Sequence, residues 1–193
     1  MKISYTLTEE DFLQHQLYLA SQSQRIRKKE QRTWKLLSFA FSALGVTLLF
    51  TGTASPAGPL SILFAGLTVF FYPAFVKRRY VDHYRNHIRE NYQNRVGHPS
   101  DIELREDHLF MKDKTGEGKI KLEELEKLVE TRHYYFLRLK SGPSIIFPKT
   151  QIQDLAAFRK SFEDLSIPIL PDMDWEKKFV GLPNFFAKSS AKN

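Results

Sequence analysis

Cysteine is absent from the 193 residues of this chain. This excludes thiol nucleophiles, disulfides, cysteine-ligated zinc and iron–sulfur clusters. A second absence is more informative, because no Asp, Glu, Lys, Arg or His occurs in the 41 residues from Leu36 to Val76. A bilayer core requires about 20 apolar residues per helical span. The run is therefore long enough for two spans and a turn between them.

Proline and glycine divide this run near its middle, at Gly52, Pro56, Gly58 and Pro59. Both residue types stop helices and let the chain reverse. We predict spans over 34–50 and 60–76, with a loop near 51–59. A buried hairpin of a soluble bundle is the alternative, and it would need a polar outer face on each helix. Within the run that lacks ionisable residues, each span contains only three polar residues, so we favour the membrane (Ser38, Ser42 and Thr47; Ser61, Thr68 and Tyr72).

Basic residues are concentrated on both flanks of the apolar run. The segment 25–35 holds six basic residues and one acid, and 77–95 holds six basic residues and two acids. The positive-inside rule places both flanks, and hence both termini, in the cytoplasm, so we predict a two-span protein of the cytoplasmic membrane. The bilayer is the first expected partner, and the candidate lipid-headgroup contacts are Arg25, Arg27, Lys28, Lys29, Lys77, Arg78 and Arg79. The first 24 residues do not resemble a cleaved signal peptide.

The net charge of +7 and the isoelectric point near 9.5 would ordinarily suggest nucleic-acid binding. Here the excess charge is juxtamembrane. The segment 97–170 carries 12 basic and 13 acidic residues and has no basic stripe. Topology and attraction to anionic headgroups account for the charge, and we expect no nucleic-acid partner.

The segments outside the apolar run alternate between strand and helix patterns. Residues 1–7 read as a half-buried strand, and a helix that starts near Thr8 shows no break before Trp34. Tyrosines at helical spacing predict a second helix that leaves the second span and ends near Gly97. We infer that these two helices pack as a stalk. The predicted organisation is a strand and helix (1–33), the transmembrane hairpin (34–76), a helical extension (77–97), a folded domain (98–170) and a tail (171–193).

Short strands and turns dominate the chain after Pro99. Lys114–Gly118 and Ser141–Pro143 read as hairpin tips. An amphipathic helix is predicted over Gln151–Leu165. The predicted strands are 101–105, 108–112, 119–122, a stretch after a turn at 123–126, 134–140 and 144–148. The fold class is therefore α+β: a transmembrane α-helical hairpin plus a small cytoplasmic antiparallel β domain closed by a C-terminal helix.

This order of segments resembles the YcxB-like family of bacterial membrane proteins. The residues that carry the resemblance are 3–12, the apolar hairpin, 102–109, 125–130, 135–137 and 145–149. The likeness extends to about residue 165. It implies a pleckstrin-homology-like fold for the cytoplasmic domain and a membrane location. It supplies no catalytic residues.

Two short motifs have spacings that occur in catalytic or metal-binding sites. Asp113–Gly116 resembles the phosphorylation motif of ion pumps, but Glu117 stands where the motif continues with Thr, and a Gly-containing turn accounts for it better. His83 and His87 have helical metal-chelating spacing, although interfacial histidines are the plainer interpretation. No nucleophile, base and oxyanion donor converge. We expect no enzyme activity, cofactor, metal site or catalytic residue.

We therefore predict a membrane-anchored interaction module that binds a protein or peptide through an exposed sheet edge or loops. One alternative is an anionic-lipid sensor that uses the lysine-rich hairpin (Lys112, Lys114, Lys119 and Lys121). Another is a subunit of a transporter or membrane enzyme complex, or a homo-oligomer, with small residues allowing close helix approach (Ala43, Gly45, Ala65 and Gly66). The tail 171–193 could lie on the membrane, pack on the sheet or be disordered.

Overall fold

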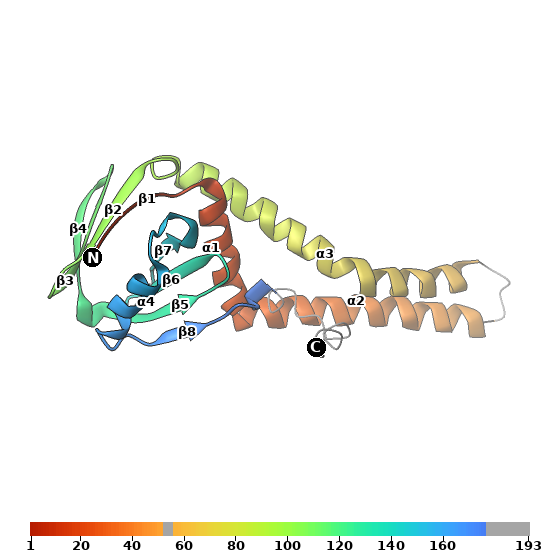
Figure 1. Cartoon of the computed structure of the whole chain (residues 1–193). Coiled ribbons are helices and arrows are strands. Elements are labelled where there is room, and N and C mark those ends of the chain that lie inside the picture. Colours follow the sequence, from red (N-terminus) through yellow and green to blue (C-terminus); the bar gives the residue numbers. More distant parts are fainter. Residues whose placement is uncertain (52–55, 177–193) are drawn as a thin grey trace. The chain divides into compact units, whose positions relative to one another are not determined.

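The computed structural model describes residues 1–51 and 56–176 and combines helices with two sheets (Figure 1). Two compact units are present. The first contains Met1–Leu17 and His83–Trp175, and the second contains Tyr18–Asp82. The predicted loop near 51–59 and the predicted tail are partly outside the described residues.

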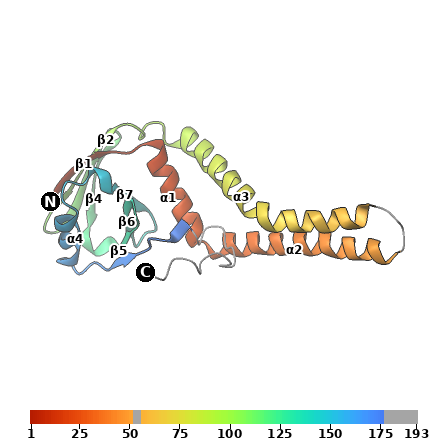
Figure 2. The ribbon, with the colours of Figure 1, turned by 45° about the vertical axis from the view of Figure 1, so that its right-hand side comes forward.

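The first sheet of the first unit is antiparallel and has the strand order β1-β2-β3-β4. Its strands are β1 (Lys2–Thr6), β2 (Pro99–Leu104), β3 (His108–Asp113) and β4 (Gly116–Lys121). β1 precedes the apolar helices in the chain and β2 follows them, yet the two pair directly, with Ile3 opposite Ile102 (Figure 2). Residues from before and after the apolar helices thus build one sheet.

The second sheet has the order β7-β6-β5-β8. It contains β5 (Leu125–Glu130), β6 (Tyr134–Leu139), β7 (Ser144–Pro148) and β8 (Ile169–Pro171), and β8 pairs with β5 in parallel. Helix α4 (Leu155–Glu163) places Phe158 and Phe162 in the core, where they are 1% and 0% exposed. Both sheets contribute buried residues to this core, including Ile102, Leu109, Leu128, Leu137 and Phe147.

The strands agree with the sequence pattern within one to three residues, and the predicted turn before β5 is a short 3-10 helix, Leu122–Glu124. The prediction of a helix over Gln151–Leu165 was too long. The carboxylate of Asp154 accepts hydrogen bonds from the backbone N–H groups of Ala156 and Ala157, both at 2.9 Å, and so starts α4 later. β8 was not predicted.

The expectation that the first helix runs unbroken toward Trp34 was wrong. Helix α1 (Glu9–Gln22) ends and helix α2 (Gln24–Phe50) begins at Ser23. The Ser23 hydroxyl accepts a hydrogen bond from the backbone N–H of Ile26 at 3.3 Å and caps α2.

Helix α3 (Ala57–Asn91) continues through Pro73 and is followed by turns before Gly97. Both α2 and α3 are long and apolar enough to cross a membrane, and 6% and 17% of their apolar windows are buried in the chain. Within the second unit they pack closely. A Cβ built on Gly45 would lie 2.6 Å from Ile62 Cγ1, and the Phe41 and Phe64 ring centroids are 6.2 Å apart.

Candidate binding groove and helix junction

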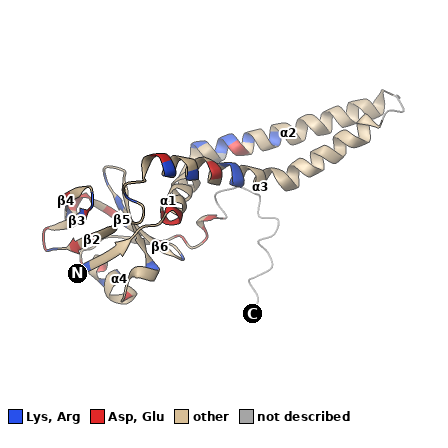
Figure 3. Cartoon of the chain, turned by 90° about the horizontal axis from the view of Figure 1, so that it is seen from above, with Lys and Arg blue, Asp and Glu red and all other residues tan. Residues whose placement is uncertain are grey.

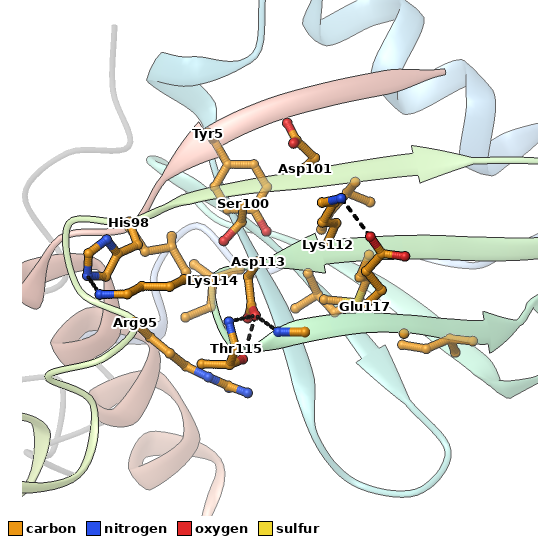
Figure 4. Close-up of a pocket in the computed structure, with 18 of the residues that line it drawn as sticks. Tyr5, Arg95, His98, Ser100, Asp101, Lys112, Asp113, Lys114, Thr115 and Glu117 are labelled. Atoms are coloured by element: carbon orange, nitrogen blue, oxygen red, sulfur yellow. Dashed lines mark hydrogen bonds and ion pairs between the residues drawn. The ribbon is translucent and has the colours of Figure 1, made fainter.

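A cavity of about 450 Å³ lies in the first unit, with residues of both sheets in its walls (Figure 4). Tyr5, Ile102, Met111 and Ile120 line it from the first sheet, and Ile145 lines it from the second. Its volume falls in the usual range of ligand pockets, about 300–1,000 Å³. We call this cavity the groove.

Two strand edges border the groove. β4 ends the first sheet and β7 ends the second, and residues of both line the cavity. Among the described residues, no strand pairs with the outer side of either. Buried backbone N–H and C=O groups need partners. A free edge next to an apolar cavity therefore offers hydrogen bonds to an extended chain that enters it.

Two lysines on the groove's rim lie close to other ionisable side chains. Lys112 Nζ lies 2.6 Å from Glu117 Oε1, and Lys114 Nζ lies 3.3 Å from His98 Nε2 (Figure 4). The hydrogen bond and the charge of Glu117 raise the pKa of Lys112. Lys112 is therefore the one lysine of this hairpin that forms an ion pair with an acidic partner among the described residues, whereas the histidine beside Lys114 supplies no negative charge.

Asp113 organises the tip between β3 and β4. Its Oδ1 accepts hydrogen bonds from the Thr115 side chain and from the backbone N–H groups of Thr115 (2.7 Å) and Gly116 (3.1 Å). The Thr115 hydroxyl contributes most to lowering the pKa of Asp113, and Arg95 also contributes. The sequence interpretation of this motif as a turn agrees with this geometry, since Gly116 has φ +156°.

A second polar cluster lies in the second unit, where α2 and α3 pack. Glu30 is 9% exposed and accepts three hydrogen bonds: Tyr72 Oη at 2.9 Å, Arg79 Nη2 at 2.9 Å and Tyr80 Oη at 3.0 Å. We call these four residues the helix junction. It supports the predicted packing of the two helices next to their apolar parts. Its partners are 42 to 50 residues from Glu30 in sequence, so pattern analysis did not find it.

The seven basic residues predicted to contact headgroups lie on α2 and α3 close to their apolar parts (Figure 3). Arg79 forms an ion pair with Glu30. Arg25, Lys28, Lys29, Lys77 and Arg78 are exposed and form no ion pair among the described residues. Arg27 lies on α2, and its side chain is outside the described part of the structure.

The small residues considered for contact with partner helices divide into two groups. Gly45 and Ala65 are buried, and Gly45 allows α2 and α3 of this chain to approach each other closely. Ala43 and Gly66 are exposed. The predicted close approach therefore occurs first within this chain.

The two histidines with metal-chelating spacing, His83 and His87, are both exposed. His87 Nδ1 lies 3.1 Å from Asn91 Nδ2. Within residues 1–51 and 56–176, no group of three His, Asp or Glu side chains is placed to hold a metal ion.

The fold is thus a mixed helix-and-sheet unit joined in sequence to two long apolar helices. Residues 104–160 match the model of the YcxB-like protein family. This match supports the family resemblance stated from the sequence. It covers β3 to most of α4, which include both β4 and β7 of the groove. No curated protein and no solved structure matches the chain.

Proposed function

We propose that this chain is a two-span protein of the cytoplasmic membrane with both termini in the cytoplasm. The support is physical. The apolar windows of α2 and α3 leave large side chains bare, with Phe39 72%, Phe50 87% and Phe70 73% exposed. Water would penalise that much apolar surface, whereas lipid accepts it. The basic flanks then lie on the cytoplasmic side.

We further propose that the first unit is a pleckstrin-homology-like binding module that docks an extended peptide of a protein partner and does not catalyse a reaction. A core between two sheets and one helix supports that fold class. The observation that carries the binding proposal is that two strand edges, β4 and β7, which no described strand covers, border one groove lined by both apolar and charged side chains. A peptide that enters it would add a strand to a sheet and bury alternate side chains.

The charge pattern of the groove favours a peptide over a phosphate headgroup. Asp101, Asp113 and Glu117 line the same cavity as Arg95 and the lysines. These carboxylates would oppose a dianionic phosphate. Main-chain hydrogen bonds from a strand edge need no net charge, and the apolar floor provides the contact area.

The register of β3 and β4 identifies which backbone groups are available. Asp113 pairs with Gly116 across the tip, so they form the closing hydrogen-bonded pair of a two-residue hairpin loop. Hydrogen-bonded pairs alternate along an antiparallel ladder. The N–H groups of Glu117, Lys119 and Lys121 therefore point away from β3, toward an incoming strand.

The test uses full-length protein in nanodiscs and a displayed library of random peptides. Lys119→Pro removes one outward N–H from β4 without breaking the β3–β4 ladder, and Lys119→Ala is the control because it removes the charge and keeps the N–H. We expect enriched peptides to lose binding at least about tenfold with Lys119→Pro, as the loss of an obligatory hydrogen bond implies. Lys119→Ala should bind nearly as well as the wild type. No enrichment over empty nanodiscs, or equal binding by both variants, would reject peptide docking.

The membrane topology has its own test, which the absence of cysteine makes simple. Thr51→Cys and Ser141→Cys each introduce a single exposed thiol, at the end of α2 and at the β6–β7 tip. A membrane-impermeant maleimide should label the first variant in intact spheroplasts. It should label the second variant only after permeabilisation. The reverse pattern would reject the proposed orientation.

A further inference from the structure

The outer face of α2 carries a hollow that the groove and the helix junction do not involve. Its volume is about 460 Å³, and it is lined by Lys28, Gln31, Arg32, Lys35, Leu36 and Phe39. All of these residues lie in the second unit and on a single helix. They fall at the point where the basic segment of α2 meets its apolar segment (Figure 3).

Helical spacing shows why three cations converge there. Lys28, Arg32 and Lys35 follow one another at i, i+4 and i+7, and at 3.6 residues per turn they fall within about 60° of each other around the axis. Phe39 continues the same line. Glu30 lies about 140–160° from each of these three residues, on the face that packs against α3. We call Lys28, Arg32, Lys35, Leu36 and Phe39 the outer stripe.

The charge of the outer stripe is uncompensated within the described residues. Lys28, Arg32 and Lys35 are exposed and take part in no ion pair there. Glu30 is the one acid between residues 25 and 35, and its carboxylate is occupied by Tyr72, Arg79 and Tyr80. The helix junction thus draws the local negative charge to the opposite face, and it leaves three cations without an acidic partner around one hollow.

The lower end of the outer stripe is apolar and bare. Leu36 is 56% and Phe39 72% exposed. Lys28 and Lys35 are separated by about 10 Å along the axis, and Phe39 lies about 6 Å further toward the apolar segment, at 1.5 Å per residue. This order of cations, then aliphatic and aromatic surface, matches the order of phosphate and acyl chain in a phospholipid.

We propose that the outer stripe is a binding site for one anionic phospholipid, whose headgroup phosphate is held by Lys28, Arg32 and Lys35 and whose acyl chain packs on Leu36 and Phe39. This inference rests on the proposed membrane insertion of α2, which brings the outer stripe to the headgroup level. Guanidinium and ammonium groups both hold phosphate oxygens through charge-assisted hydrogen bonds. A lipid supplies phosphate and chain together, which a free phosphate ion does not.

The experiment compares lipid retention by three full-length proteins in nanodiscs of mixed phosphatidylcholine and phosphatidylglycerol. The wild type is compared with Lys28→Gln/Arg32→Gln/Lys35→Gln and with the matched control Lys2→Gln/Lys140→Gln/Lys160→Gln. The control removes the same charge from exposed positions of the first unit, which contains neither the hollow nor the predicted headgroup contacts. Native mass spectrometry after release from the discs reports the phosphatidylglycerol that stays bound.

Each basic residue near an anionic surface strengthens binding about fivefold, so three that act on one lipid give on the order of a hundredfold. We expect the outer-stripe variant to lose retained phosphatidylglycerol by at least about tenfold. The control should stay within about threefold of the wild type. A wild type that retains no phosphatidylglycerol, or equal losses in both variants, would overturn the site.

The same experiment separates this inference from the function on which it rests. A wild-type chain that does not enter nanodiscs at all would contradict the membrane proposal. A chain that inserts but shows no preference for phosphatidylglycerol over phosphatidylcholine would contradict the lipid site alone. Free inorganic phosphate added to discs of pure phosphatidylcholine should leave no adduct, and an adduct there would show that an ion, and not a lipid, is the ligand.

Discussion

Glu30 of α2 accepts a hydrogen bond from the hydroxyl of Tyr72 on α3 at 2.9 Å, although 42 residues separate them. Arg79 and Tyr80 donate to the same carboxylate. A buried carboxylate is tolerated when it is paired and hydrogen-bonded, and removing its partner is costly. The pairing therefore sets the relative position of α2 and α3 where the basic and apolar segments meet.

Glu30→Ala should destabilise the hairpin because it leaves Arg79 without its ion-pair partner and removes an acceptor from two tyrosine hydroxyls. We expect a loss of about 1–2 kcal/mol in the free energy of unfolding, because Arg79 is 53% exposed and water replaces part of the lost interaction. Titration of the detergent-solubilised protein with SDS, followed by tryptophan fluorescence, measures it. The control is Glu90→Ala, since Glu90 is exposed on α3. Equal losses in the two variants would show that the helix junction does not stabilise the hairpin.

Gly45→Ala should also destabilise the hairpin. The added Cβ would lie 2.6 Å from Ile62 Cγ1 and 3.1 Å from the Gly58 carbonyl oxygen, so the helices must separate. Overpacking of this kind costs about 1–3 kcal/mol. Gly66→Ala is the control, because a Cβ there meets nothing within 4 Å. The same SDS titration should show a clear loss for the first variant and none for the second.

The first unit should lose stability as the pH falls below the pKa of a free histidine. His15 is 8% exposed, its Nε2 has no hydrogen-bond partner among the described residues, and burial lowers its pKa to about 4. The unfolded chain, with a His pKa of about 6.5, then binds more protons than the folded chain between these values. Stability is therefore complete above pH about 6.5 and decreases as the pH falls, by about 2 kcal/mol at pH about 5.

The measurement is urea unfolding at a series of pH values, with His15→Phe as the comparison. His15 packs against Phe136, with ring centroids 5.2 Å apart, so an aromatic replacement keeps that contact. The variant should lose the pH dependence between about 6.5 and 5. If wild type and variant have the same slope, His15 does not cause it.

The ion pairs of Glu130 should contribute more to the free energy of unfolding than an exposed set of ion pairs on the same strand, β5. Glu130 is paired with Lys149 at 2.9 Å and Arg159 at 2.7 Å, and its side chain is 12% exposed. Burial opposes its ionisation, but the hydrogen bond and charge of Lys149, with Tyr135 and Arg159, lower its pKa overall. Its contribution is thus present above the ordinary Glu pKa and is lost as the pH falls through the lowered value.

Glu130→Ala should cost about 3 kcal/mol in urea unfolding at neutral pH, because it leaves a largely buried lysine without its partner. Glu126→Ala provides the matched control. Glu126 also pairs with two cations, Lys127 and Arg138, but its side chain is 38% exposed, so its removal should cost at most about 1 kcal/mol. A larger effect from Glu126 would contradict the ranking by burial.

Sequence reasoning located the elements whose signals are local. The tip at Ser141–Pro143 was predicted from its glycine and proline. Gly142 there adopts φ +109°, a backbone conformation that other residues avoid. The two apolar helices were found because a long run without ionisable groups is typical of helices of membrane-spanning length. In both cases the relevant residues are neighbours in the chain.

The features that were missed depend on partners far away in sequence or on weak local signals. Ser23 is unremarkable in a helical sequence until its hydroxyl caps α2. β8 has three residues and is defined by its parallel pairing with β5. The groove exists because two sheet edges meet in space, and nothing in the pattern of Gly116–Lys121 or of Ser144–Pro148 indicates that encounter. Such information belongs to the tertiary fold.

The pairing of β1 with β2 has a consequence for biosynthesis. Lys2–Thr6 leaves the ribosome before the two apolar helices, but its partner Pro99–Leu104 is made only after them. During translation β1 must stay unpaired while both helices are made, and closing so long a loop delays its docking. A recombinant fragment that starts beyond the hairpin would lack that strand permanently and would expose the edge of β2 to self-association.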